Sequence, residues 1–186
     1  MVAREIANTK TLLASRVDGI LVSISKETDD FKHLYNLKNN GILMVFYVRV
    51  IPGFNADQVI IDDFDTAYRT TKHLVESGRK RIAHFAGPQN LLIGQYRKDG
   101  YLKAINEAGL GTADNLIFEA DNFESARLAV LNILDNNIKI DGLFAVNDLT
   151  AIGAMQSLQK RGVKFRTKLL LQVFPTAVFQ GLPTRH

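Results

Sequence analysis

Residues 59–87, VIIDDFDTAYRTTKHLVESGRKRIAHFAG, decide the fold class of this 186-residue chain. The apolar runs Val59–Ile61 and Ile82–Ala86 each have the length and composition of a buried strand. Between them apolar side chains recur at helical spacing, and Gly78 ends the predicted helix. Two strands separated by one helix cannot pair as a hairpin, so this stretch predicts parallel strands joined by a right-handed crossover.

The same alternation of strand and helix continues on both sides of this stretch. Gly19–Val22 is an almost continuous apolar run, which predicts a strand buried on both faces. We therefore expect an α/β fold with parallel sheets whose two faces are covered by helices. The predicted helices span residues 5–15, 31–38, 64–77, 97–108, 125–134 and 149–161, and the predicted strands span residues 19–22, 43–50, 59–61, 82–86, 116–119 and 142–146.

The composition excludes several classes of protein. Hydrophobic residues make up 46% of the chain and charged residues 23%, which is typical of a globular domain and not of a disordered, collagen-like or coiled-coil chain. There is no cysteine, and no two of the four histidines have the spacing of zinc ligands on one helix face, so we expect no metal site and no cofactor. Without a membrane-length apolar run or a signal-peptide pattern, we expect a soluble, cytoplasmic chain with no membrane partner.

The net charge of +4 comes from the end of the chain. Residues 1–148 contain all 19 acidic residues and 17 of the 23 basic residues, so this part is slightly acidic and predicts no nucleic-acid surface. After Gly162 the alternation of elements stops. The apolar run Leu169–Phe174 then stands in an acid-free tail, where it is either a terminal edge strand or part of an aberrant sequence.

In open parallel sheets, ligands bind beyond the carboxyl ends of the strands, so the residues that follow each apolar run are the candidate site. This set is polar, includes an aromatic ring and contains no catalytic pairing, and no nucleotide-binding, hydrolase or zinc-protease motif occurs in the chain. We expect a protein that is not an enzyme and that binds a small hydroxylated molecule. The set comprises Ser23, Ser25, Tyr47, Arg49, Asp62, Gly87, Pro88, Asp121, Asn122, Phe123, Asn147 and Asp148.

Several of these residues also have a purely structural interpretation. Asp148 could be the N-cap of the helix predicted from residue 149. Phe123 could be a core residue, and a further candidate outside this set, Arg97 on a predicted helix face, could be a solvated charge. Gly87 and Pro88 could simply form a turn.

Five stretches, in their order and spacing, resemble the effector-binding domain of LacI/GalR transcription regulators. The resemblance extends from about Glu5 to Lys164. The stretches are VDGILVS (17–23), GILMVFYVRV (41–50), VIIDDFDTAYRTTKHLVESGRKRIAHFAGP (59–88), RKDGYLKAINEAGL (97–110) and DGLFAVNDLTAIGAMQSLQKRGV (141–163).

The resemblance implies a periplasmic-binding-protein-like fold of two lobes, with an effector, commonly a sugar or a nucleobase, in the cleft between them. Residues 1–62 would be a partial first lobe, 63–165 the second lobe and 166–186 the aberrant tail. It also implies that Arg97 reaches the ligand, that Asn147 and Asp148 face it and that Phe123 packs on it. The predicted ligand-binding set is therefore Ser23, Ser25, Arg49, Arg97, Phe123, Asn147 and Asp148.

The sequence also departs from the family. Val48 precedes Arg49 where the family often has aspartate, so one carboxylate acceptor for sugar hydroxyls is missing. The family's helix-turn-helix, hinge helix, first strand and following helix do not precede Glu5, so we expect a truncated regulator that would bind DNA only through that absent domain and would form a homodimer when complete. The alternative is a periplasmic sugar-binding protein of a transporter, although residues 7–19 resemble the regulators more.

A frameshift near Phe165 is our hypothesis for the tail. Back-translation of residues 165–178, read from the last base of the Phe165 codon, permits PNKIAIAGFSNSR, which resembles the family's next strand. We expect the genomic DNA to show a helix-turn-helix reading frame upstream and family sequence in another frame after Phe165. DNA that encodes no family sequence in any downstream frame would contradict the hypothesis.

Overall fold

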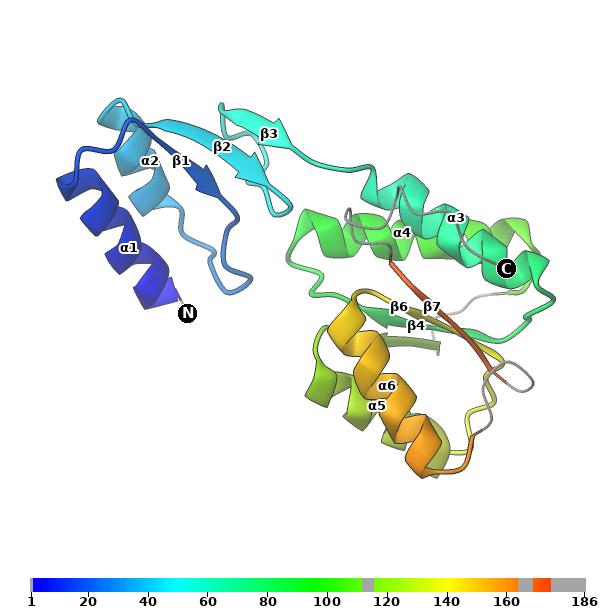
Figure 1. Ribbon diagram of the computed structural model, residues 1–186. Coiled ribbons are helices and arrows are strands. Elements are labelled where there is room, and N and C mark those ends of the chain that lie inside the picture. Colours follow the sequence, from blue (N-terminus) through cyan, green and yellow to red (C-terminus); the bar gives the residue numbers. More distant parts are fainter. Residues whose placement is uncertain (1, 112–115, 164–168, 175–186) are drawn as a thin grey trace, which may run out of the picture. The chain divides into compact units, whose positions relative to one another are not determined.

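The computed structural model describes residues 2–111, 116–163 and 169–174 (Figure 1). The chain forms two compact units, one of Met1–Ile61 with Asn90–Leu92 and one of Asp62–Gln89 with Ile93–His186. Over the described ranges, no helix is long and apolar enough to cross a membrane.

The first unit contains a three-stranded parallel sheet in the order β1-β2-β3. These strands are β1 (Gly19–Val22), β2 (Leu43–Tyr47) and β3 (Asp57–Val59). Two helices, α1 (Val2–Ala14) and α2 (Lys32–Asn39), pack against each other in the same unit. The predicted order of elements is confirmed for this unit, including the end of α2 just before Gly41, whose φ of 81° is left-handed.

Only one face of this sheet is buried in the described structure. Met44 and Phe46 of β2 are buried, whereas Leu43 is 74% exposed and Leu21 of β1 is 76% exposed. The expectation that residues 19–22 are buried on both faces is therefore wrong. The apolar run correctly predicted a strand, but among the described residues no element covers the face that carries Leu21 and Leu43.

Two strands of this unit differ from their predicted bounds. Strand β2 ends at Tyr47 instead of residue 50, because Val48 adopts a left-handed φ of 60° that turns the chain out of the strand. Strand β3 occupies Asp57–Val59, so it overlaps the predicted strand only at Val59, and Ile60 and Ile61 lie beyond its end.

The second unit has a four-stranded parallel sheet in the order β5-β4-β6-β7. All residues of the two central strands β4 and β6 are buried, so the prediction of a sheet covered on both faces is confirmed for them. The strands are β4 (Ile82–Ala86), β5 (Ile117–Glu119), β6 (Gly142–Ala145) and β7 (Leu170–Val173). The helices are α3 (Asp63–Glu76), α4 (Leu92–Glu107), α5 (Phe123–Asp135) and α6 (Asp148–Lys160).

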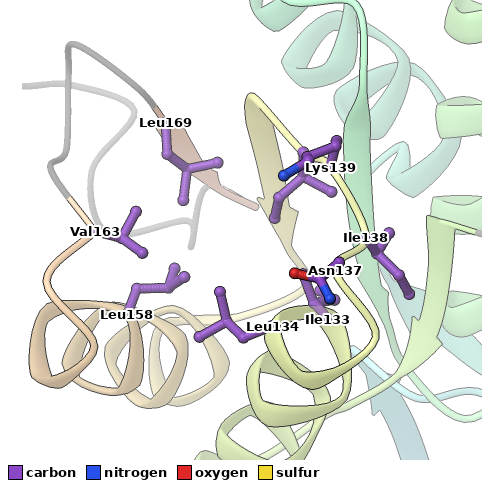
Figure 2. A pocket seen from close by; sticks show the side chains of 9 residues that line it. Ile133, Leu134, Asn137, Ile138, Lys139, Leu158, Val163 and Leu169 are labelled. Atoms are coloured by element: carbon purple, nitrogen blue, oxygen red, sulfur yellow. The ribbon is translucent and has the colours of Figure 1, made fainter.

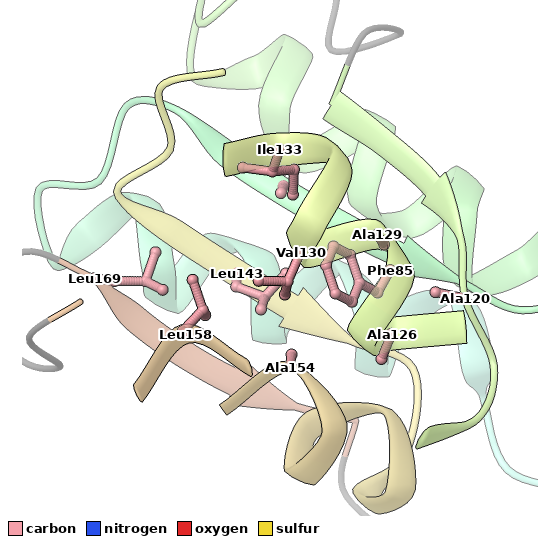
Figure 3. Close-up of a cluster of buried hydrophobic side chains, with 11 residues drawn as sticks. Phe85, Ala120, Ala126, Ala129, Val130, Ile133, Leu143, Ala154, Leu158 and Leu169 are labelled. Carbon is pink, nitrogen blue, oxygen red and sulfur yellow. The ribbon is translucent and has the colours of Figure 1, made fainter. Parts of the chain in front are cut away.

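Alternate residues of the central strands belong to two separate cores. On one face, Phe85 and Leu143 meet side chains of α5 and α6, such as Val130 and Leu158 (Figure 3). On the other face, Ile82 and Phe144 meet residues of α3 and α4, with Leu74 and Tyr101 fully buried in the second core. This two-sided burial of apolar side chains stabilises the unit.

The apolar run of the tail forms the edge strand β7. Val173 pairs with Ala145 of β6, and the backbone N–H of Phe174 donates to the Ala145 carbonyl over 2.9 Å. The edge-strand interpretation of Leu169–Phe174 is therefore confirmed. The rest of the predicted tail, residues 166–168 and 175–186, lies outside the described residues, and the frameshift stays a hypothesis.

His84 is a polar side chain in the middle of β4. It is fully buried and stacks between the rings of Tyr101 and Phe144, with centroids 5.0 and 4.6 Å away. Its Nδ1 lies 3.2 Å from the Phe144 carbonyl oxygen and must carry the proton to donate to it, while Nε2 has no hydrogen-bond partner among the described residues. Burial lowers the pKa of His84 to about 3, because the charged ring would lose its hydration.

We predict that His84 makes the protein acid-sensitive. Its folded pKa lies below the unfolded value of about 6.5, so the unfolded chain takes up the proton first and stability falls by roughly 1.4 kcal/mol per pH unit below that value. The variant His84→Phe keeps the ring stack but removes the titration, so its unfolding free energy should fall less steeply between about pH 6 and 4. Urea unfolding at several pH values measures this slope. The variant His73→Phe changes an exposed histidine and serves as the control, and a slope in His84→Phe equal to the wild-type slope would refute the prediction.

Candidate ligand-binding site

Arg97 of α4 lies at the carboxyl edge of the second sheet. Its Nε–H donates to the Asp63 carboxylate over 2.8 Å, and an Nη1–H donates to the Val146 carbonyl over 2.8 Å. The guanidinium carbon lies 3.5 Å from the centroid of the Phe174 ring. With a side chain only 12% exposed, Arg97 is not the solvated charge of the structural interpretation.

The ion pair between Arg97 and Asp63 is largely removed from water. Burial raises the pKa of Asp63, although the positive charge of Arg97 opposes this effect. Burial likewise lowers the pKa of Arg97, and Asp63 opposes that shift. A guanidinium has five N–H donors, and two are used here, so three remain without an acceptor among the described residues. These donors can bind the hydroxyl or carbonyl oxygens of a ligand.

Asn147 is the N-cap of α6. Its Oδ1 accepts from the Thr150 backbone N–H over 2.9 Å, and its Nδ2 donates to the Asp121 carbonyl over 2.9 Å. The expectation that Asp148 could cap this helix is therefore wrong, because the helix begins at Asp148 itself, which is exposed. Asn147 thus ties the segment after β5 to the end of β6 and retains one amide N–H for other partners.

Phe123 is the first residue of α5, directly after the N-cap Asn122 and its capping box with Ser125. Its side chain is 38% exposed, which contradicts the core interpretation. The Phe123 carbonyl lies against Gly153 of α6, where a Cβ atom would come within 2.4 Å of that oxygen. Glycine at 153 therefore allows the start of α5 to approach α6 closely. The hydrogen bond from Asn147 to the Asp121 carbonyl holds the segment just before Phe123 beside the end of β6.

The first unit brings Ser23 and Arg49 together at the ends of β1 and β2. Arg49 Nε–H donates to Ser23 Oγ over 3.4 Å, and the Arg49 carbonyl accepts from the Ile24 N–H over 3.5 Å. The left-handed turn at Val48 produces this return of the chain. A β-branched residue rarely adopts such a conformation, and backbone strain of this kind is concentrated at functional segments.

Glu5 fixes the loop after β1 and was not among the predicted site residues. One carboxylate oxygen accepts from the Ser25 backbone N–H over 2.6 Å. The other accepts from Thr28 Oγ1 and is paired with His33 Nε2, each over 2.9 Å. The only signal for this role in the sequence was a carboxylate at the beginning of a predicted helix. Ser25 itself contributes to this network through its backbone.

Asp63 and Phe174, the partners of Arg97, were also missed. Asp63 stood at a predicted strand end without a role, and Phe174 lay in the tail that the sequence interpretation treated as aberrant. The described residues hold no group of three or more histidine, aspartate or glutamate side chains that could bind a metal ion.

A separate apolar pocket of about 220 Å³ lies at the opposite, amino-terminal end of the second sheet (Figure 2). Its lining is mostly hydrocarbon, so it offers few hydrogen bonds to a hydroxylated ligand. The lining residues are Ile133, Leu134, Asn137, Ile138, Lys139, Ile140, Leu158, Val163 and Leu169.

Comparison with known families gives a match over nearly the whole chain. Residues 3–185 match the model of periplasmic binding proteins and the sugar binding domain of the LacI family. The match therefore continues beyond Lys164, where the resemblance in the sequence ended.

The curated relatives are transcription regulators. The HTH-type transcriptional repressor PurR of Actinobacillus pleuropneumoniae serotype 5b (strain L20) is 30% identical over 153 residues, which are 82% of this chain and 45% of that protein. The HTH-type transcriptional regulator CelR of Thermobifida fusca is 30% identical over 154 residues, 81% of this chain and 45% of that protein. The chain thus spans about half the length of these relatives.

Solved structures of regulators share the fold. The transcription regulator CcpA of Lactococcus lactis has a TM-score of 0.82 and 26% identity, over 92% of this chain and 62% of that chain. A complex of the transcriptional regulator CelR with cellobiose has a TM-score of 0.77 and 27% identity, over 89% of this chain and 51% of that chain.

Proposed function

Since the chain belongs to the family of periplasmic binding proteins and LacI-type sugar-binding domains, we propose that it binds a sugar as the effector of a transcription regulator. The observation that carries this proposal is the fixed guanidinium of Arg97 with three N–H donors left over. Phe123, exposed at the same edge, can cover the apolar face of a sugar ring. Asn147 and Asp148 would add hydrogen bonds, and Ser23, Ser25 and Arg49 would contribute from the first unit.

Binding would control transcription through a helix-turn-helix domain of the kind that the relatives' names record. The transporter alternative is not favoured, because the matched curated relatives are regulators of transcription. We accordingly place the protein in the cytoplasm and assign it binding without turnover. We also propose that residues 1–62 and 63–165 belong to the two lobes of the effector domain, and the boundary of the compact units after Ile61 supports this division.

A homodimer is the second part of the proposal. Helix α6 exposes Leu149, Ile152 and Met155 at a spacing of three residues, with exposed fractions of 60, 40 and 38%. Leu128 is 53% exposed on α5, which packs against α6. An apolar stripe of this kind on a soluble domain is typical of a protein interface. We therefore assign it to contact with a second copy of the chain.

Sugar binding is tested by isothermal titration of the full chain with neutral mono- and disaccharides. Cellobiose is the first probe, because a structural relative was solved with it. We expect saturable binding that Arg97→Lys weakens roughly tenfold to hundredfold, because an ammonium group cannot reproduce the planar fork. The variant Arg69→Lys, at a side chain that is 77% exposed on α3, is the matched control. A folded wild type that binds no sugar would overturn the proposal.

The dimer is tested by sedimentation of the wild type and of two charge variants. Ile152→Glu should convert the dimer to a monomer, because it places a charge within the apolar stripe. Leu43→Glu changes a side chain that is 74% exposed in the first unit and should leave the dimer intact. The opposite result would move the interface to the first sheet, and a monomeric wild type would rule out the dimer.

A further inference from the structure

We infer that Asp63 and Phe174 position Arg97 for ligand binding, and that the Asp63 carboxylate makes the site select a neutral hydroxylated effector over an anionic one. The inference rests on the proposed function, because it takes Arg97 to contact the effector. It adds Asp63 and Phe174 to the candidate site and specifies that the ligand is uncharged.

The contacts of Arg97 restrain its guanidinium within its plane and on one face. The hydrogen bonds to Asp63 and to the Val146 carbonyl, both 2.8 Å long, fix the group within its own plane. The Phe174 ring, 3.5 Å from the guanidinium carbon, supports one face of that plane. The three remaining N–H donors therefore have defined directions before any ligand arrives, which lowers the entropic cost of binding.

Phe174 is itself held firmly. Its side chain is 2% exposed and packs in the core with Phe144, Tyr101 and other residues between the sheet and helices α3 and α4. Its backbone N–H is bonded to the Ala145 carbonyl, so strand pairing fixes the ring's position beneath Arg97. The tail strand β7 thus contributes a supporting residue to the candidate site.

Asp63 offsets the positive charge of the Arg97 guanidinium. It is the first residue of α3, its side chain is 8% exposed, and it balances the positive charge of Arg97. This buried carboxylate would offset the attraction of the guanidinium for an anionic ligand on the remaining N–H donors. The neighbouring strands are followed by Asp121 and Asp148, which add no positive charge. A neutral hydroxyl group accepts the same hydrogen bonds and does not depend on a net positive charge.

The positioning role of Phe174 is tested by nuclear magnetic resonance on the ¹⁵N-labelled full chain. The Arg97 Nε–H signal, assigned by its loss in Arg97→Lys, should be shifted by the ring below it and protected from exchange by Asp63. Phe174→Leu should remove the ring shift and weaken binding of the best sugar of the panel roughly tenfold, because the guanidinium loses its support. The variant Phe174→Tyr keeps an aromatic ring at this position, so it should retain both the ring shift of the Arg97 signal and the wild-type sugar affinity. An Arg97 signal and a sugar affinity unchanged in Phe174→Leu would overturn this part.

The charge selection is tested with inorganic phosphate as the anionic probe. The wild type should show no saturable shift of the Arg97 Nε–H signal, whereas Asp63→Asn should bind phosphate at least roughly tenfold more tightly, because the amide keeps the hydrogen bond but not the charge. Asp65→Asn, which removes an exposed carboxylate from the same helix turn, is the control. Equal phosphate binding by the wild type and Asp63→Asn would contradict the selection.

These outcomes separate the inference from the proposed function. If no sugar binds but the Arg97 signal responds to both variants as expected, the effector proposal fails and the positioning holds. If a sugar binds through Arg97 while Phe174→Leu and Asp63→Asn behave like the wild type, only this inference fails.

Discussion

The burial of β4 and β6 on both faces is the constraint on which the second unit depends. Strands buried on two sides admit no charged residue along their length, so helices must cover both faces and polar groups must gather where the strands end. The chain leaves β6 at Val146, whose carbonyl binds Arg97, and the next residue, Asn147, caps α6. The candidate site is thus a direct consequence of how the core is built.

The first unit shows how far an apolar pattern can be interpreted. Residues 19–22 have the composition of a strand buried on both faces, and they do form a strand, yet Leu21 is 76% exposed. A run of apolar residues records that the side chains suit a buried environment. It carries no information on which segment covers them, so the strand was predictable from the sequence and the exposed face was not.

The position of the candidate residues beyond the strand ends was predictable, whereas their contacts were less so. The rule that ligands bind beyond strand ends, together with the family resemblance, selected Arg97, Phe123 and Asn147 from the sequence. Asp63 and Phe174 were not predicted as part of the candidate site. They lie 34 and 77 positions from Arg97 in the sequence, and only the fold of the second unit brings them together. The cap of α6 was misplaced by one residue, since Asn and Asp are almost equally good N-caps.

The candidate residues of the two units are held with different firmness. Arg97 is fixed by two bonds of 2.8 Å and a buried ring, so it needs little rearrangement to bind. In the first unit, the Arg49–Ser23 bond is 3.4 Å long and follows the strained turn at Val48. A ligand shifts a conformational equilibrium only through a difference in its affinity for the two states. Because the guanidinium of Arg97 is already fixed, under the proposed function it would add affinity without needing a rearrangement of its own unit.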